Sequence, residues 1–151
     1  MTGVLAATGG FLLAVLWMDL MFDIAARRGK AILEEPVLQS ITAYYRRATT
    51  TSQPMGAVIA GVMLLLLAAL TAEAVRGDSP GWLIGASALL AGGPISLALL
   101  RTVPNAVRLG RRTGSPAEQA RLARAVFRDH VVCAIGMALF VALWVAQSVS
   151  G

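Results

Sequence analysis

The 151-residue chain contains few of the residues that hold disulfide-bonded or metal-bound proteins together. Its one cysteine, Cys133, excludes an intrachain disulfide. Its one histidine, His130, excludes haem held by two histidines, and the tight Glu-x-x-His spacing of di-metal helix bundles is absent. We predict no metal, and the sequence identifies no cofactor. Phosphate-binding loops, catalytic-triad motifs and nucleic-acid modules are also missing.

Charged residues are scarce as well, at 14% of the chain against roughly a quarter in soluble domains. Apolar residues make up 57%, and the mean hydropathy is +0.71. A soluble core of this size could not hide so much apolar surface. The net charge of +5 does not indicate nucleic-acid binding, because the basic residues gather at the ends of apolar runs, where anionic lipid headgroups attract them.

Four apolar runs approach the roughly 20 residues that a helix needs to cross a bilayer. They cover about residues 4–24, 55–75, 82–100 and 131–149. The chain is therefore predicted to be one all-α membrane domain, residues 1–151, built as a bundle of four transmembrane helices. Membrane lipids are its expected partners, and a homo-oligomer is compatible with the pattern.

The basic residues also predict an orientation, because positively charged loops stay in the cytoplasm. Only Arg76 follows the second run, and both tails lack Lys and Arg. The first and third loops carry all the others: Arg27, Arg28, Lys30, Arg46 and Arg47, then Arg101, Arg108, Arg111, Arg112, Arg121, Arg124 and Arg128. A multi-pass protein of the cell membrane is expected, with both termini outside and loops one and three in the cytoplasm.

Both long loops are predicted to contain an amphipathic helix. In loop one, Pro36 suits a first helical turn, and apolar residues follow at steps of three and four as far as Ala48. This helix should lie on the inner membrane surface or tuck under the bundle. In loop three, Ser115 suits a helix cap three residues before Glu118, and a helix from there could continue into the fourth span.

Three smaller features complete the sequence-based picture of the spans. Gly92-Gly93-Pro94 predicts a kink or a close helix contact in the third span. Trp82 and Trp144 are expected in an outer interfacial belt. Glu73 and Arg76, three residues apart, are expected to form an ion pair near the outer surface.

Asp19 and Asp23 are the most informative polar residues, since their spacing of four places both on one face of the first span. A charge near the bilayer centre costs about 2.5–3.5 kcal/mol on insertion scales, so this face should point into the bundle. We therefore predict a polar cluster at the cytoplasmic end of the bundle. Its other candidate members are Tyr44, Tyr45, Arg46, Arg101, Asn105, Arg128, Asp129 and His130.

Three interpretations of this cluster remain open. Asp19 and Asp23 could pair with Arg101 or Arg128 and only hold the helices together. They could instead tune His130 as the proton carrier of a small-molecule site. Two carboxylates and one histidine are also the ligand set of non-haem iron enzymes.

Three short stretches give the chain a family resemblance. Residues 41–55 form a helix and polar break before the second span, residues 101–106 contain Val-Pro-Asn, and residues 127–131 place His130 at the start of the fourth span. In these features the chain resembles the anthrone-oxygenase-like family of small four-helix membrane proteins, most of which have no assigned function. The resemblance implies a cofactor-light oxygenation of a polyketide anthrone to a quinone, with His130 and Asn105 near the substrate.

Two functions of different classes follow. In the first, the protein is an oxygenase or redox-type enzyme that acts on a lipophilic small molecule. His130 is then general acid or base, Asp19 or Asp23 tunes it, and Arg101 and Asn105 stabilise an oxyanion. Tyr44, Tyr45 and Arg128 complete the substrate site. In the second, the protein is a non-catalytic partner subunit or small transporter component. A ligand-sized void at His130 would favour the enzyme, and arginines filling that space would favour the alternative.

Overall fold

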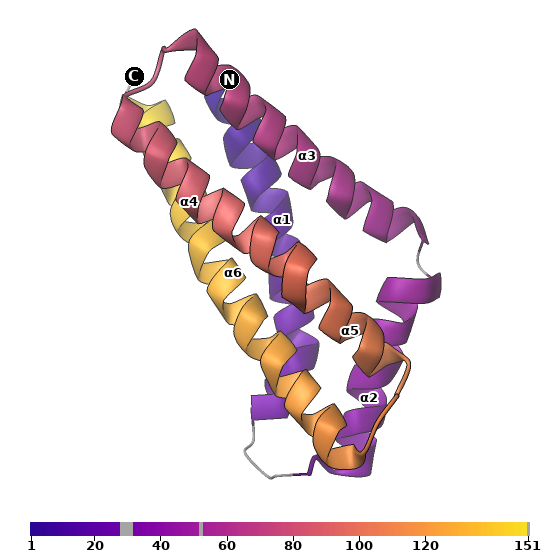
Figure 1. Ribbon diagram of the computed structural model, residues 1–151. Coiled ribbons are helices and arrows are strands. Elements are labelled where there is room, and N and C mark those ends of the chain that lie inside the picture. Colours follow the sequence, from indigo (N-terminus) through magenta and orange to yellow (C-terminus); the bar gives the residue numbers. More distant parts are fainter. Residues whose placement is uncertain (28–31, 52, 151) are drawn as a thin grey trace.

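The protein is all-α in a computed structural model that describes residues 1–27, 32–51 and 53–150 (Figure 1). No strand occurs within those ranges. Four helical stretches are long and apolar enough to cross a membrane: Thr2–Arg27, Pro54–Arg76, Gly81–Gly110 and Pro116–Val149. The predicted four-span bundle is therefore confirmed, and the chain has the make-up of a multi-pass membrane protein.

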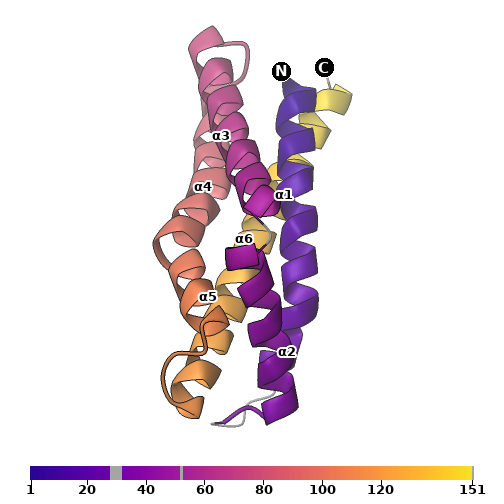
Figure 2. The same cartoon turned by 90° about the vertical axis from the view of Figure 1, so that its right-hand side faces the viewer.

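The helices form four long columns. The first is α1 (Thr2–Asp23) with a 3₁₀ turn (Ile24–Arg27), and the second is α2 (Glu35–Arg46), a π-helical turn (Arg47–Thr51) and α3 (Gln53–Arg76). The third is α4 (Gly81–Leu97), a second π-helical turn (Ala98–Thr102) and α5 (Val103–Gly110), and the fourth is α6 (Pro116–Ser150). Both termini and the α3–α4 connection lie at one end, the terminal end; α2 and α5 lie toward the other, the loop end (Figures 1 and 2).

The bundle is longer than a bilayer is thick. With 35 residues, α6 is about 52 Å long, whereas the hydrocarbon core measures about 30 Å. The start of α6 therefore stands outside the hydrocarbon when the rest of the helix spans it. This helix begins where the sequence predicted, since the Ser115 hydroxyl accepts a hydrogen bond from the Glu118 amide at 3.3 Å. The Glu118 carboxylate bonds Arg108 instead of completing a capping box.

Two separate apolar cores hold the columns together. The core at the terminal end consists of Leu5, Leu12, Leu66, Ala69, Leu70, Leu83, Ala91, Ile95, Met137, Phe140 and Trp144. The core at the loop end consists of Ala26, Leu33, Leu38, Ile41, Tyr45, Ala106, Leu109, Ala120, Leu122, Ala123 and Val126. Large apolar side chains such as Leu64, Leu89 and Ile135 are exposed on the outside, which suits contact with lipid.

The loop helices partly match expectation. The amphipathic helix of loop one is α2, with Pro36 in its first turn, and it buries Leu38, Ile41 and Tyr45 within the loop-end core. It therefore packs against the other helices at the loop end, chiefly α5. Helix α5 was not predicted from the sequence. Here Pro104 lies in the first turn of α5, where its missing amide hydrogen is not needed.

Two predictions about the spans are wrong. Trp144 does not belong to an interfacial belt: it is fully buried and its indole donates a hydrogen bond to Ser87 at 3.0 Å. Glu73 and Arg76 do not pair, because Ser79 donates to Glu73 and Arg76 binds Asp78 at 3.0 Å. Trp82, by contrast, is exposed at the start of α4.

For Gly92-Gly93-Pro94 the sequence predicted either a kink or a close helix contact. The structure shows a close contact between this segment and α6. The Pro94 ring packs on Gly136 of α6, where an added Cβ would lie 2.9 Å from Pro94 Cγ and 3.2 Å from the Leu90 carbonyl oxygen. A proline ring and a helix backbone cannot easily move away. The absence of a side chain at Gly136 therefore sets how closely α4 and α6 approach.

We predict that Gly136→Ala destabilises the folded protein by about 1–3 kcal/mol, because the new methyl group overpacks this contact. Thermal unfolding in detergent measures the change. Gly85→Ala on α4 is the matched control, since its Cβ would meet open space and alanine favours helix. Equal unfolding temperatures for the two variants would contradict the proposed contact.

Candidate functional site

His130 lies between the two aspartates of α1. Its Nδ1 is 2.7 Å from Asp23 Oδ2, and its Nε2 is 3.8 Å from Asp19 Oδ2. The four-residue spacing of Asp19 and Asp23 puts both carboxylates on the α1 face that packs along α6. The structure thus brings together the three residues predicted to be catalytic.

The two tyrosines of α2 close the other side of this arrangement. The Tyr45 hydroxyl donates to Asp23 Oδ1 at 2.6 Å, and the Tyr44 hydroxyl donates to Asp19 Oδ1. Each carboxylate therefore has its own tyrosine, and His130 lies between the two pairs. We refer to Asp19, Asp23, Tyr44, Tyr45 and His130 as the acid–histidine cluster.

Burial within the cluster is graded. The side chain of Asp23 is 0% exposed and that of His130 is 9% exposed, whereas Asp19 retains 17% exposure. Access to the cluster therefore runs past Asp19. Along the bundle, the cluster lies between the terminal-end and loop-end cores, so a buried polar layer separates two apolar ones.

The hydrogen bonds fix the roles of the two imidazole nitrogens. A carboxylate only accepts hydrogen bonds, so Nδ1 must carry the hydrogen shared with Asp23. Nε2, on the Asp19 side, is left as the nitrogen that can exchange a proton. An imidazole oriented in this way by a buried carboxylate has the arrangement of a general base.

The same contacts keep both tyrosines protonated. Burial, followed by the adjoining carboxylate of Asp19, raises the pKa of Tyr44 above its usual value. Burial and the charge of Asp23 raise the pKa of Tyr45 in the same direction. A negative phenolate beside a carboxylate in a poorly solvated site is unfavourable. The tyrosines therefore act as hydrogen-bond donors.

The predicted arginine partners are wrong. Arg101 Nε lies 3.2 Å from Asp129 Oδ2, so this arginine neutralises Asp129 and not Asp19 or Asp23. Arg128 is exposed on α6. Asn105 is half-buried on α5, and across the described residues neither it nor Arg128 bonds the cluster. The oxyanion role predicted for Arg101 and Asn105 has no geometric support, nor has the substrate contact predicted for Arg128.

Asp129 and Thr102 also belong to the polar layer. Asp129 is buried and paired with Arg101, and the Thr102 hydroxyl lies 3.5 Å from its Oδ2. Asp129 was a predicted member of the cluster, although its pairing with Arg101 was not predicted. Thr102 gave no signal, because it belongs to the π-helical turn after α4.

The sequence predicted either a ligand-sized void at His130 or arginine side chains that fill this space, and neither is found. Tyrosines, not arginines, fill the space beside the carboxylates. An apolar groove of about 460 Å³ instead lies between α1 and α6 at the same level. It is lined by Trp17, Leu20, Met21, Ile24, Phe127 and Val131.

Among the described residues, no group of three His, Cys, Asp or Glu side chains is placed to hold a metal ion. Comparisons with protein-family models, curated proteins and solved structures found no match for this chain. The geometry of the acid–histidine cluster is therefore the observation from which a function can be inferred.

The raised tyrosine pKa values make a pH-dependent prediction, since Tyr44 and Tyr45 are the only tyrosines in the chain. Tyrosine in the unfolded chain ionises near pH 10. Tyrosinate absorbance of the folded protein should therefore stay flat through about pH 11 and rise only on unfolding. Because the folded-state pKa values are higher, stability should be full below about pH 10 and fall as the pH rises further.

The variants Tyr44→Phe and Tyr45→Phe each remove one phenol group. Comparison of their absorbance titrations with that of the wild-type protein therefore assigns the tyrosinate signal to one tyrosine or the other. A folded protein whose tyrosinate signal has its midpoint near pH 10 would show that both hydroxyls are free of the carboxylates.

Proposed function

We propose that this protein is an integral membrane enzyme that moves a proton to or from a lipophilic small molecule, with His130 as general base or acid. The observation that carries the proposal is the position of His130: Nδ1 is 2.7 Å from fully buried Asp23, and Nε2 faces the accessible carboxylate of Asp19. Asp23 orients the imidazole, and Tyr45 holds Asp23. The oriented Nε2 is then the atom that exchanges the proton.

The groove between α1 and α6 supports a lipophilic substrate. It is lined by apolar side chains alone, and its volume of about 460 Å³ is within the range of small-molecule sites. Phe127 and Val131 flank His130 on α6, and Leu20 lies next to Asp19 on α1. Neither Asp19 nor His130 lines the groove, so a ring system that enters it from the lipid would have to extend a polar edge beyond the lining residues to meet them.

The family resemblance narrows the proposed reaction to oxygenation of an anthrone. The anthrone methylene is flanked by two aromatic rings that are conjugated with the carbonyl across the central ring, so a base can remove one of its protons to give a stabilised carbanion. Reaction with O₂ then converts the CH₂ group to C=O. One oxygen atom remains on that carbon, and the other leaves with the two hydrogens as water. His130 would accept the first proton.

The experiment is oxygen consumption and quinone formation by the purified protein in detergent with an anthrone as substrate. We expect His130→Asn to lower the rate by about a hundredfold or more, in line with the loss of a general base. Val132→Ala, at an exposed position two residues further along α6, is the matched control and should keep the wild-type rate.

Three results would count against the proposal. No anthrone turnover by the wild-type protein would contradict oxygenation. Equal rates for His130→Asn and Val132→Ala would contradict the proton-transfer role. If His130→Asn unfolds, Tyr44→Phe keeps the ring that stacks on Phe22 and removes only the hydroxyl bonded to Asp19. An unchanged rate and pH profile in that variant would indicate that the polar layer takes no part in the reaction and only holds the helices together.

The same proposal includes an orientation in the cell membrane. The arginines of the first and third loops support a cytoplasmic loop end, with both termini and the α3–α4 connection outside. The acid–histidine cluster would then lie near the inner leaflet, within reach of a lipophilic substrate that enters from the cytoplasmic side.

Single-cysteine labelling tests this orientation in a Cys133→Ala background. We expect a membrane-impermeant thiol reagent on intact cells to label Asp78→Cys in the α3–α4 connection. Ile32→Cys and Thr113→Cys, in the first and third loops, should be labelled only after permeabilisation. Labelling of Ile32→Cys and Thr113→Cys from opposite sides would overturn the four-span topology itself.

A further inference from the structure

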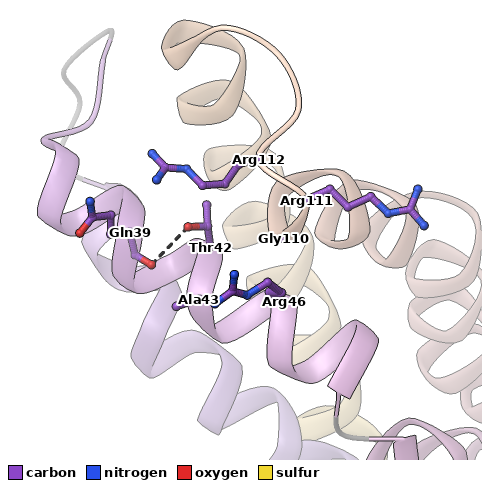
Figure 3. Close-up of a pocket in the computed structure, with 7 residues that line it drawn as sticks. All are labelled: Gln39, Thr42, Ala43, Arg46, Gly110, Arg111 and Arg112. Atoms are coloured by element: carbon purple, nitrogen blue, oxygen red, sulfur yellow. Dashed lines mark hydrogen bonds between the residues drawn. The ribbon is translucent and has the colours of Figure 1, made fainter.

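A second concave site lies on the face of α2 that points away from His130. Gln39, Thr42 and Arg46 follow one another at steps of three and four along α2, whereas Leu38, Ile41 and Tyr45 face the loop-end core. The end of α5 forms the opposite wall with Gly110, Arg111 and Arg112. Together they border a cavity of about 470 Å³, which we call the arginine pocket (Figure 3).

A close backbone contact builds this pocket. A Cβ added at Gly110 would lie 2.8 Å from the Arg46 backbone nitrogen and 3.0 Å from the Tyr45 carbonyl carbon. Because Gly110 has no side chain, the end of α5 rests directly on α2. This contact brings Arg112 within the same pocket as Arg46, and Figure 3 shows these two side chains on either side of Thr42, with Arg111 extending away.

Arg112 adopts a conformation that an ordinary residue avoids. Its φ is +51°, in the left-handed region where glycine usually ends a helix. This conformation is sterically unfavourable for an arginine. Such strained residues occur at sites that hold ligands, so the outlier motivates a binding role. The guanidinium group of Arg112 extends over α2, where it donates a hydrogen bond to Glu35.

The charges at the pocket favour an anion. Arg46, Arg111 and Arg112 contribute three positive charges, and Glu35, which accepts a hydrogen bond from Arg112 at 2.7 Å, contributes one negative charge at the rim. The C-terminal ends of α2 and α5 each add about half a negative charge. The arginines therefore outweigh the negative groups, and the Glu35 pair is exposed enough to exchange for a stronger ligand.

We propose that the arginine pocket binds a phosphate group, supplied either by an anionic lipid headgroup or by a soluble phosphate compound. The planar guanidinium forks of Arg46 and Arg112 match two oxygens of a phosphate each. The α3 span begins at Pro54, eight residues after Arg46, so the pocket lies near the headgroup layer of the bilayer. This site is independent of the reaction proposed for His130.

The test titrates the purified full-length protein in neutral detergent with three probes: phosphatidylglycerol, phosphatidylcholine and inorganic phosphate. Native mass spectrometry and the rise in unfolding temperature report binding. We expect phosphatidylglycerol to bind more tightly than phosphatidylcholine. If inorganic phosphate competes with it, the pocket accepts a soluble phosphate; if it does not compete, the lipid headgroup is the ligand.

The double variant Arg46→Gln/Arg112→Gln should weaken this binding by roughly ten- to a hundredfold, since each lost charged hydrogen bond to phosphate has a large effect. Arg121→Gln/Arg128→Gln is the matched control, because it removes the same charge from exposed positions on α6. It should change binding less than twofold. Equal losses in the two double variants, or no binding of either anionic probe by the wild-type protein, would overturn the proposal.

Arg112→Gly separates binding from folding. Glycine adopts the left-handed conformation without strain, so this variant should unfold at the wild-type temperature or above it. It should nevertheless bind phosphatidylglycerol more weakly. Full binding by Arg112→Gly would contradict the proposed role of Arg112.

Discussion

The contact between His130 and Asp23 fixes how α1 and α6 lie against each other. A fully buried carboxylate must be hydrogen-bonded, and Asp23 meets this requirement through His130 and Tyr45 alone among the described contacts. If α1 rotated or slid by one residue, Asp23 would lose both partners and face the apolar cores or lipid. The rest of the bundle therefore packs around this layer, with one core on each side of it.

Much of the fold follows from the sequence because lipid imposes simple rules. Apolar runs of sufficient length gave the four spans, and the steps of three and four after Pro36 gave α2. The inward face of Asp19 and Asp23 followed from the cost of a charge in hydrocarbon. His130 could be assigned to the same level, because it starts the fourth apolar run. The sequence therefore determined the depth of most polar residues along the bundle.

The sequence did not determine how each helix is rotated about its own axis. This is the common cause of the wrong predictions. Arg101 lies at the right level, but it points to Asp129, so the tyrosines of α2 take the places expected for arginines. Trp144 is on the fourth span as expected, yet it faces Ser87 and not the lipid. The two π-helical turns change which faces point inward after them, and no local pattern indicated either turn.

The position of Asp23 in the chain also constrains how the protein is assembled. His130 follows it by 107 residues, whereas Tyr45 follows it by only 22. At about 5–20 residues per second, a ribosome needs roughly 5–20 seconds to make the intervening segment up to His130. During that interval α1 carries two acids without their imidazole. Helix α2 supplies their first hydrogen-bond donors, the hydroxyl groups of Tyr44 and Tyr45, long before α6 is made.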